Sequence, residues 1–145
     1  MKKTLTVLVA DDDSFVRDLL GAKLRSAGYD VLEAASGDAA AAALGSGAEI
    51  RVVVCDVRMP GAISSAALLQ LVRSKYPAVR FVVMSGLPVN ELSHEKYGAA
   101  DGFISKPFTL FDLLDLVNRQ MARAPVARKP PARQGAISGA VERYF

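Results

Sequence analysis

The sequence predicts an α/β fold, a three-layer (βα)5 domain built on a doubly wound parallel sheet. Short apolar runs recur along the chain with helical patterns between them, and the strongest runs are almost entirely apolar. A strand that is apolar on both faces is typical of a parallel sheet covered by helices on both sides. Alternating strands and helices favour right-handed crossovers between parallel neighbours.

Five strands are expected, at residues 5–10, 29–33, 50–55, 79–84 and 102–105. The first, third and fourth runs are rich in Val, Leu and Ile, whereas the second and fifth show weaker patterns. Five such strands suit the strand order 2-1-3-4-5 of a flavodoxin-like sheet. In that sheet a ligand binds beyond the carboxyl ends of the strands, at the switch point between strands 1 and 3.

Helices are expected between the strands because apolar residues recur at three- and four-residue intervals. Three helical faces carry Val16, Leu19, Leu20 and Leu24, then Leu68, Leu71 and Val72, and finally Leu110, Leu113, Leu114, Val117 and Met121. The Ala-rich residues 39–44 suit close packing on a sheet. Residues 89–97 show the weakest helical pattern.

The length of 145 residues suits one domain with a short appendage, and the 51% of hydrophobic residues suffices for a core. The only cysteine, Cys55, excludes an internal disulfide and a zinc site made of several thiolates, so a reducing cytoplasm fits. The apolar runs are too short to span a membrane. Neither a signal peptide nor a membrane partner is expected.

Charge and composition change near residue 122. Residues 122–145 carry five basic residues and one acidic residue, whereas residues 1–121 carry 13 basic and 14 acidic residues. Three prolines lie in the same segment. We therefore expect a folded domain at residues 1–122 and a basic tail rich in Pro, Ala and Arg at residues 123–145.

The tail is interpreted as a solvated extension, because it cannot bury enough surface to become ordered. The alternative is a docking element, since Ile137, Val141 and Tyr144 follow a four-three spacing that suits a short helix over residues 136–145. Nucleic acid is not expected as a partner, because the five scattered basic residues come without a groove-reading motif.

Charged and hydroxyl side chains follow four of the expected strands. Asp11, Asp12 and Asp13 follow the first, Asp56 the third, Ser85 the fourth and Lys106 the fifth. These groups are expected on one rim of the sheet, where the carboxyl ends of parallel strands meet. Converging carboxylates repel one another, so they either stay partly protonated or bind a cation; a divalent metal is the simpler explanation, and their hard oxygens favour Mg²⁺. A carboxylate beside Mg²⁺ can attack a phosphoryl group, with a lysine and a hydroxyl as supports.

Four segments at these strand ends carry a specific combination of motifs. They are VLVADDD at residues 7–13, VVCDVRMPG at 53–61, VMSG at 83–86 and GAADGFISKPF at 98–108. In this order, they resemble the receiver domain of two-component response regulators. The resemblance covers residues 4 to about 122 and implies a single-domain response regulator with a short tail.

The resemblance also implies roles for the acidic residues on the rim. Asp56 would be the phosphoacceptor. Asp11 and Asp12 would bind Mg²⁺ together with Asp56 and the main-chain carbonyl of Arg58. Asp13 is expected to cap the first helix instead, because a carboxylate is favourable at a helix N-terminus.

Four residues on or directly after the last two expected strands complete the implied site. Lys106 would contact the phosphoryl group, and its peptide bond to Pro107 would be cis. Ser85 would donate a hydrogen bond to the phosphoryl group and act as a switch residue with Phe103. Phe103 taken alone also suits a core position, and Ser85 before Gly86 also suits a simple turn.

Two other residues receive structural interpretations, and two features depart from the usual receiver pattern. Cys55 is expected to be a buried apolar side chain, and His94 a solvated residue of the surface. Residues 62–67 lack the frequent acidic-glycine turn, which leaves the shape of that loop open. Arg58 and Leu87 are expected to overhang the phosphoryl group and to influence how fast water reaches it.

The expected function is a phosphorylation switch and not the turnover of an external substrate. A histidine kinase or histidine phosphotransfer protein would donate the phosphoryl group, and the face of helix 4, strand 5 and helix 5 would change for a downstream protein target. One alternative is a pseudo-receiver that acts only as an interaction module. Another is a small Mg²⁺-dependent phosphatase of α/β fold, but residue 58 is Arg where such an enzyme needs a second acid-base carboxylate.

Overall fold

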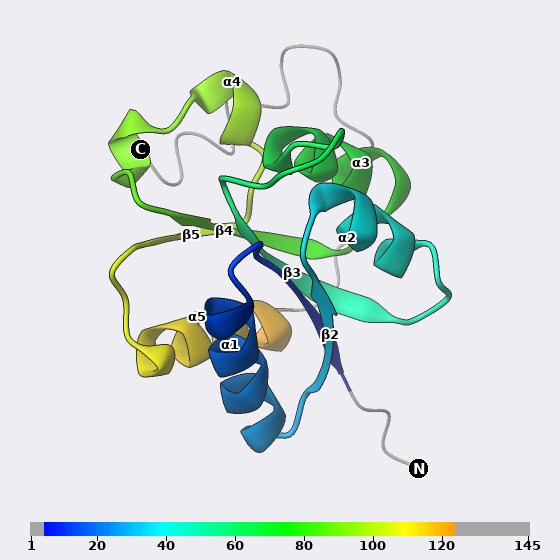
Figure 1. Ribbon diagram of the computed structural model, residues 1–145, viewed down its shortest axis with the longest axis vertical. Coiled ribbons are helices and arrows are strands. Elements are labelled where there is room, and N and C mark those ends of the chain that lie inside the picture. Colours follow the sequence, from blue (N-terminus) through cyan, green and yellow to red (C-terminus); the bar gives the residue numbers. More distant parts are fainter. Residues whose placement is uncertain (1–4, 124–145) are drawn as a thin grey trace.

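The computed structural model of the protein describes residues 5–123, and a five-stranded sheet runs through its centre (Figure 1). The strands are β1 (Thr6–Ala10), β2 (Asp30–Ala34), β3 (Ile50–Asp56), β4 (Arg80–Ser85) and β5 (Gly102–Ser105). Each begins and ends within one residue of its expected bounds. The order β2-β1-β3-β4-β5, with every neighbouring pair parallel, confirms the predicted fold class.

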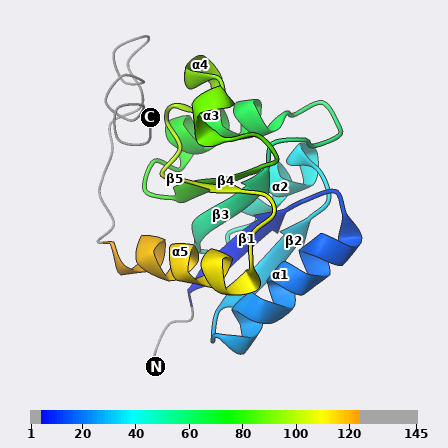
Figure 2. The same cartoon turned by 90° about the vertical axis from the view of Figure 1, so that its left-hand side faces the viewer.

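Helices form a layer on each face of the sheet. They are α1 (Ser14–Ser26), α2 (Gly37–Leu44), α3 (Ser65–Lys75), α4 (His94–Tyr97) and α5 (Leu110–Ala122), with a 3-10 turn η1 (Val89–Glu91). The helices α1 and α5 cover one face, and α2, α3 and α4 cover the other (Figure 2). This arrangement confirms the three predicted layers.

The central strands are apolar on both faces because both faces are covered. In β1, Val7 and Val9 pack toward α1 and α5, whereas Leu8 and Ala10 pack toward α2 and α3. All four side chains are fully buried. Successive side chains of a strand point to opposite faces, so burial on both sides requires an unbroken apolar run.

The weak helical pattern at residues 89–97 corresponds to two short turns instead of one helix. The backbone of Leu92 is extended between η1 and α4, and its side chain is buried in the core beneath α3. Ser93 then caps α4, because its hydroxyl accepts a hydrogen bond from the amide N–H of Lys96. A residue that turns inward and a new N-cap together divide the segment.

A buried charged group lies at the start of β4 and β5, and the sequence pattern did not indicate it. Arg73 and Arg80 both contact the carboxylate of Asp101, and each of the three residues is at most 4% exposed. The guanidinium of Arg73 also donates to the carbonyls of Val79 and Ala99, at 2.9 Å each. The group therefore joins α3 to the strands on its side of the sheet, with one carboxylate shared between two guanidinium groups and hydrogen-bonded to both.

The expected domain boundary falls close to the end of α5 at Ala122. Residues 124–145, including the helix expected over 136–145, lie outside the described residues. Within residues 5–123, no helix is long and apolar enough to cross a membrane.

Candidate functional site

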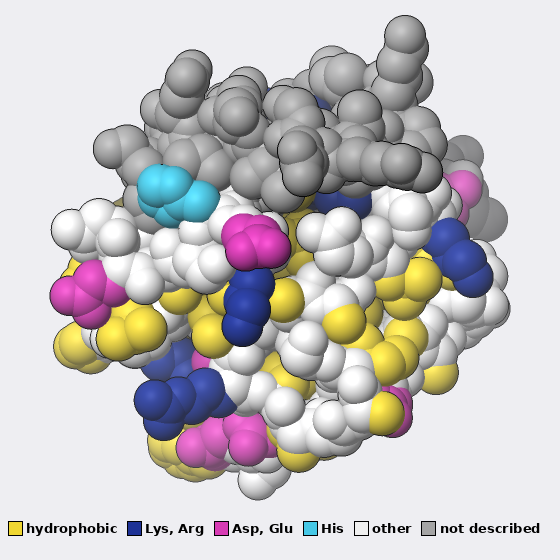
Figure 3. Space-filling view, turned by 90° about the horizontal axis from the view of Figure 1, so that it is seen from above, with side chains coloured by type: hydrophobic (Ala, Val, Ile, Leu, Met, Phe, Trp, Pro, Cys, Tyr) yellow, Lys and Arg dark blue, Asp and Glu magenta, His cyan; other side chains and the backbone are white. Residues whose placement is uncertain are grey.

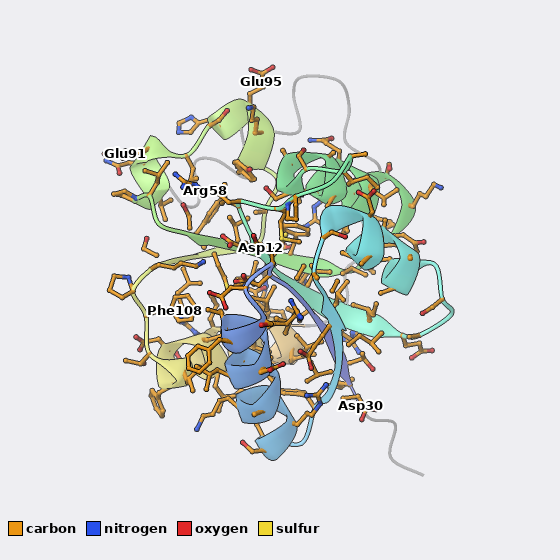
Figure 4. All side chains as sticks on the ribbon, viewed as in Figure 1. Asp12, Asp30, Arg58, Glu91, Glu95 and Phe108 are labelled. Carbon is orange, nitrogen blue, oxygen red and sulfur yellow. The ribbon has the colours of Figure 1, made fainter. Side chains whose placement is uncertain are left out.

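Four connections bring the expected site residues to the same end of the sheet. Asp11 directly follows β1, Asp56 ends β3, Ser85 ends β4 and Lys106 directly follows β5. In Figure 4, Asp12 and Arg58 lie at this end, whereas Asp30, at the start of β2, lies at the opposite end. The parallel register is the cause, because it aligns the ends of all the strands.

Three carboxylates converge at this end of the sheet. Asp11, Asp12 and Asp56 each offer one oxygen, and the three oxygens lie within 4.8 Å of one another. Asp11 is 1% exposed, Asp56 is 8% exposed and Asp12 is exposed. Burial raises the pKa of Asp11 above its ordinary value, although a hydrogen bond from the Asp13 N–H opposes the rise; the nearby Asp56 charge adds to it.

The oxygens of Asp11 show how this group suits a cation. Oδ1 accepts a 2.9 Å hydrogen bond from the Asp13 amide, but the buried Oδ2 accepts none. A buried carboxylate oxygen without a hydrogen bond is costly unless a cation compensates it. Hard carboxylate oxygens that converge from two strand ends are the ligand type that Mg²⁺ prefers. The residues present therefore fit a divalent cation.

Lys106 supplies the positive charge of the site. Its Nζ lies 3.2 Å from Oδ2 of Asp56 and 3.8 Å from Oδ2 of Asp11. Its amide donates a 2.7 Å hydrogen bond to the carbonyl of Ser85, and the Lys106–Pro107 peptide bond is cis, as the resemblance implies. The side chain remains 35% exposed, so the ammonium is accessible to an incoming anion.

A cavity of about 330 Å³ opens beside these residues. It is lined by Asp56, Val57, Arg58, Ser85, Gly86, Leu87 and Lys106. The hydroxyl of Ser85 accepts a 2.9 Å hydrogen bond from the Leu87 amide and is buried at the cavity wall. Arg58 and Leu87 are both exposed at the rim, where side chains can control the access of water.

Ser85 and Phe103 share one face of the sheet. In the register of β4 and β5, Val83 is paired with Phe103 and Ser85 with Ser105. Because Ser85 is two residues beyond Val83, its side chain points to the same face as Phe103. Phe103 is partly buried and packs on the core beneath α2, α3 and α4.

The loop that lacks the acidic-glycine turn is held by a residue from α2. Oδ1 of Asp38 accepts a 2.9 Å hydrogen bond from the Ile63 amide and lies close to Gly61, whose φ is +99°. Gly37 packs so tightly on the Ile63 carbonyl that a Cβ would lie 1.9 Å from it. Neither contact was expected, because both join residues that are far apart in the sequence.

The interpretations of three further residues agree with the structure. Asp13 is the N-cap of α1, and its carboxylate accepts hydrogen bonds from the amides of Phe15 and Val16. Cys55 is fully buried, and burial raises the pKa of its thiol far above the ordinary range. His94 is exposed, and Figure 3 shows the only histidine on the surface.

The family model of the response regulator receiver domain matches residues 7–118. The chain belongs to this family. It is 33% identical over 138 residues to the response regulator protein FleR of Pseudomonas aeruginosa, covering 88% of the chain and 28% of FleR. It is 37% identical to the transcriptional regulatory protein FixJ of Azorhizobium caulinodans, covering 92% of the chain and 63% of FixJ. The chain thus spans less than two thirds of these relatives.

Solved receiver structures have the same fold. The chemotaxis response regulator CheY4 of Vibrio cholerae matches with a TM-score of 0.70 and 29% identity, covering 81% of this chain and 99% of that one. A response regulator receiver protein from Sinorhizobium medicae matches with a TM-score of 0.73 and 29% identity, covering 82% and 95%. The chain is therefore a phosphoryl-accepting signalling domain of the two-component type. Such receivers bind Mg²⁺ and pair with histidine kinases and downstream targets.

Proposed function

We propose that this receiver accepts its phosphoryl group on Asp56, from a histidine kinase or a histidine phosphotransfer protein. The observation that carries the proposal is the convergence on one cavity of the Asp56 carboxylate, the Lys106 ammonium 3.2 Å away and the Ser85 hydroxyl. The acidic pair Asp11 and Asp12 adjoins the same carboxylate. Nucleophile, cation site and phosphoryl supports therefore come from four strand ends.

In the proposed reaction, an oxygen of Asp56 attacks the phosphorus of a phosphohistidine. The new O–P bond forms as the P–N bond breaks, and the departing imidazole takes up a proton from water. Bound Mg²⁺, held by Asp11, Asp12, Asp56 and the Arg58 main-chain carbonyl, would neutralise charge on the phosphoryl oxygens. Lys106 stabilises the same oxygens from the side of β5, where its ammonium is already held near Asp56.

The added charge explains the proposed switch. A phosphoryl group brings a charge of about −1.5 to −2 and three strong acceptors. The hydroxyl of Ser85, which the Leu87 amide leaves free to donate, turns toward those acceptors. Phe103 follows on the same face, and the surface of α4, β5 and α5 changes for a downstream protein target. This cycle needs no turnover of an external substrate.

Neither alternative function has comparable support. A phosphatase needs a second acid-base carboxylate beside Asp56, and the side chain at residue 58 is an exposed Arg. A pseudo-receiver would not need the complete set of acidic pair, acceptor, hydroxyl and lysine. The buried free Cys55 supports a reducing cytoplasm as the place of action.

A titration with Mg²⁺ and then with beryllofluoride, which imitates a phosphoryl group, separates these functions. The parent chain should bind both, and NMR signals of Ser85 and Phe103 should shift together. Asp56→Asn should lose the beryllofluoride response. Asp30→Asn is the matched control, because Asp30 is an exposed carboxylate at the opposite end of the sheet. Binding of Mg²⁺ without a beryllofluoride response in the parent would favour the pseudo-receiver.

A further inference from the structure

A buried chain of hydroxyl groups connects α4 to the loop that follows Asp56. The hydroxyl of Ser65, in the first turn of α3, lies 2.7 Å from the carbonyl oxygen of Val57. It also lies 2.7 Å from the hydroxyl of Tyr97, the last residue of α4. Ser65 is 2% exposed and Tyr97 is 7% exposed, so water does not compete for these bonds.

The direction of the two hydrogen bonds follows from the donors present. A carbonyl only accepts, so the single proton of Ser65 points to Val57. Tyr97 must then donate its own proton to the oxygen of Ser65. Both bonds run in one direction, from Tyr97 through Ser65 to Val57, and bonds aligned in this way strengthen one another.

The acceptor at the end of this chain belongs to a peptide unit of the site. The carbonyl of Val57 and the amide of Arg58 lie in one rigid plane. On the other edge of that plane, the Arg58 N–H donates to Oδ1 of Asp56 at 3.4 Å. The N–H of Val57, which belongs to the preceding peptide, donates a 3.0 Å hydrogen bond to the Met84 carbonyl. The Val57–Arg58 plane therefore has Ser65 as the partner of its carbonyl and Asp56 as the partner of its N–H.

We infer that Ser65 and Tyr97 are positioning residues for the cation and phosphoryl site. They hold the Val57–Arg58 peptide so that its N–H meets Asp56, directly before the main-chain carbonyl of Arg58. The inference rests on the proposed function, in which the Arg58 carbonyl is a Mg²⁺ ligand. It adds two residues that do not touch the cation, one of them on α4, which lies beside α3 (Figure 1).

The same chain gives α4 a direct connection to the site. Any movement of the Val57 carbonyl when Mg²⁺ or a phosphoryl group binds changes the hydrogen bond of Ser65 and therefore that of Tyr97. This connection runs through the loop after β3, whereas the proposed switch of Ser85 and Phe103 runs through β4 and β5. The two routes use different residues, so substitutions can separate them.

The test measures Mg²⁺ affinity by titration calorimetry on the full chain, for Ser65→Ala, Ser65→Thr and Tyr97→Phe. Loss of a group that hydrogen-bonds a metal ligand typically weakens metal binding about 10- to 100-fold. Ser65 bonds the Val57 carbonyl, one peptide before the proposed Arg58 carbonyl ligand, so for Ser65→Ala we expect the lower end of that range, about tenfold. Tyr97→Phe keeps the ring and should weaken binding about two- to tenfold. Ser65→Thr keeps the hydroxyl and should recover most of the affinity.

Matched controls come from the same helix. Ser74→Ala removes an exposed hydroxyl that bonds to the Leu71 carbonyl, and Tyr76→Phe removes a phenol hydroxyl at the end of α3. Both should leave Mg²⁺ affinity unchanged. A purely structural role would lower the melting temperatures of the Ser65 and Tyr97 variants without changing their Mg²⁺ affinity when folded.

The outcomes separate this inference from the function on which it rests. Parent-like affinity in both Ser65→Ala and Tyr97→Phe would overturn the inference while Mg²⁺ binding by the parent upholds the proposed site. A parent chain that binds no Mg²⁺ would overturn both. Should Ser65→Ala not fold, Tyr97→Phe decides alone, because its ring still fills the core. Weakening in both variants, with less than additive effects in the double variant, would support a single connected chain.

Discussion

Replacing Asp11 with asparagine removes one of the three carboxylates that meet beyond β1 and β3. The change preserves the shape of the side chain and the acceptor oxygen that the Asp13 amide contacts. It removes a charge that burial and Asp56 disfavour. We therefore expect Asp11→Asn to unfold at a higher temperature than the parent when metal is absent, and to lose the stabilisation that Mg²⁺ gives the parent.

The magnitude follows from the distances. The carboxylate oxygens lie within 4.8 Å of one another, and at that largest separation each pair repels by about 0.9 kcal/mol in a water-like dielectric and by about 3.5 kcal/mol at an effective dielectric of 20. The Lys106 ammonium at 3.8 Å opposes this with about 1.1 or about 4.4 kcal/mol. The Asp11 charge meets two repulsions and one attraction, so it destabilises the folded state by roughly 0.6 to 2.5 kcal/mol. Removing that charge should raise the melting temperature of Asp11→Asn by about 2 to 10 °C.

The pH dependence fixes the sign of this effect. The raised pKa of Asp11 means that the folded state holds this proton more tightly than the unfolded state, whose pKa is near 3.8. Protonation of Asp11 therefore contributes to the stability of the folded state; this contribution is complete below pH 3.8 and is lost as the pH rises through the folded pKa. The advantage of Asp11→Asn should therefore grow with pH across that window and be largest near pH 7.

Thermal melts at pH 7, with EDTA and then with excess Mg²⁺, provide the assay, and Asp30→Asn provides the control at the opposite end of the sheet. Mg²⁺ should raise the melting temperature of the parent, because it binds only the folded state. An Asp11→Asn chain that melts below the parent without metal would refute the reasoning. So would one whose melting temperature rises with Mg²⁺ by as much as that of the parent.

Three further predictions concern the buried charged group at the start of β4 and β5, the cap of α1 and the tail. Asp101→Asn weakens the buried contacts with two guanidinium groups and should cost about 3 to 5 kcal/mol of unfolding free energy in urea titrations, whereas a loss under 1 kcal/mol would contradict the buried pairing. Asp13→Ala removes the cap of α1 and should cost about 1 kcal/mol without changing Mg²⁺ affinity; weakened Mg²⁺ binding would make Asp13 part of the site. Deleting residues 124–145 should leave the melting temperature and Asp56 phosphorylation nearly unchanged. If residues 136–145 are the docking element, the deletion also removes a partner from co-purification; identical partners would support the solvated extension, and a chain that unfolds would show that the tail belongs to the core.

The strand ends could be predicted from the sequence because their signal is local. A run such as β3 is apolar on both faces and then meets a charge at Asp56, so the end of the strand and the position of the carboxylate are both visible in consecutive residues. The parallel topology then brings the four strand ends together without further information. The acidic group and the position of Lys106 follow from that alone.

The supporting contacts could not be predicted, since each joins residues far apart in the chain. Asp38 bonds to Ile63 across 25 positions, and Ser65 meets Tyr97 across 32. Single polar residues carry no periodicity, and a serine at the start of a helix is ordinarily interpreted as a cap. The division of residues 89–97 was missed for a related reason, because the inward turn of Leu92 depends on the core that receives it.

The central claim is that Asp56 accepts a phosphoryl group with Mg²⁺, and the most direct measurement is labelling with acetyl phosphate followed by mass spectrometry. The parent should gain one phosphoryl group only when Mg²⁺ is present, hydroxylamine should remove it as expected of an acyl phosphate, and the modified peptide should contain Asp56. Asp56→Asn should remain unlabelled, because an amide cannot serve as the nucleophile, while Asp30→Asn should be labelled like the parent. A label that persists in Asp56→Asn and resists hydroxylamine would assign the phosphate to a hydroxyl side chain and contradict the account.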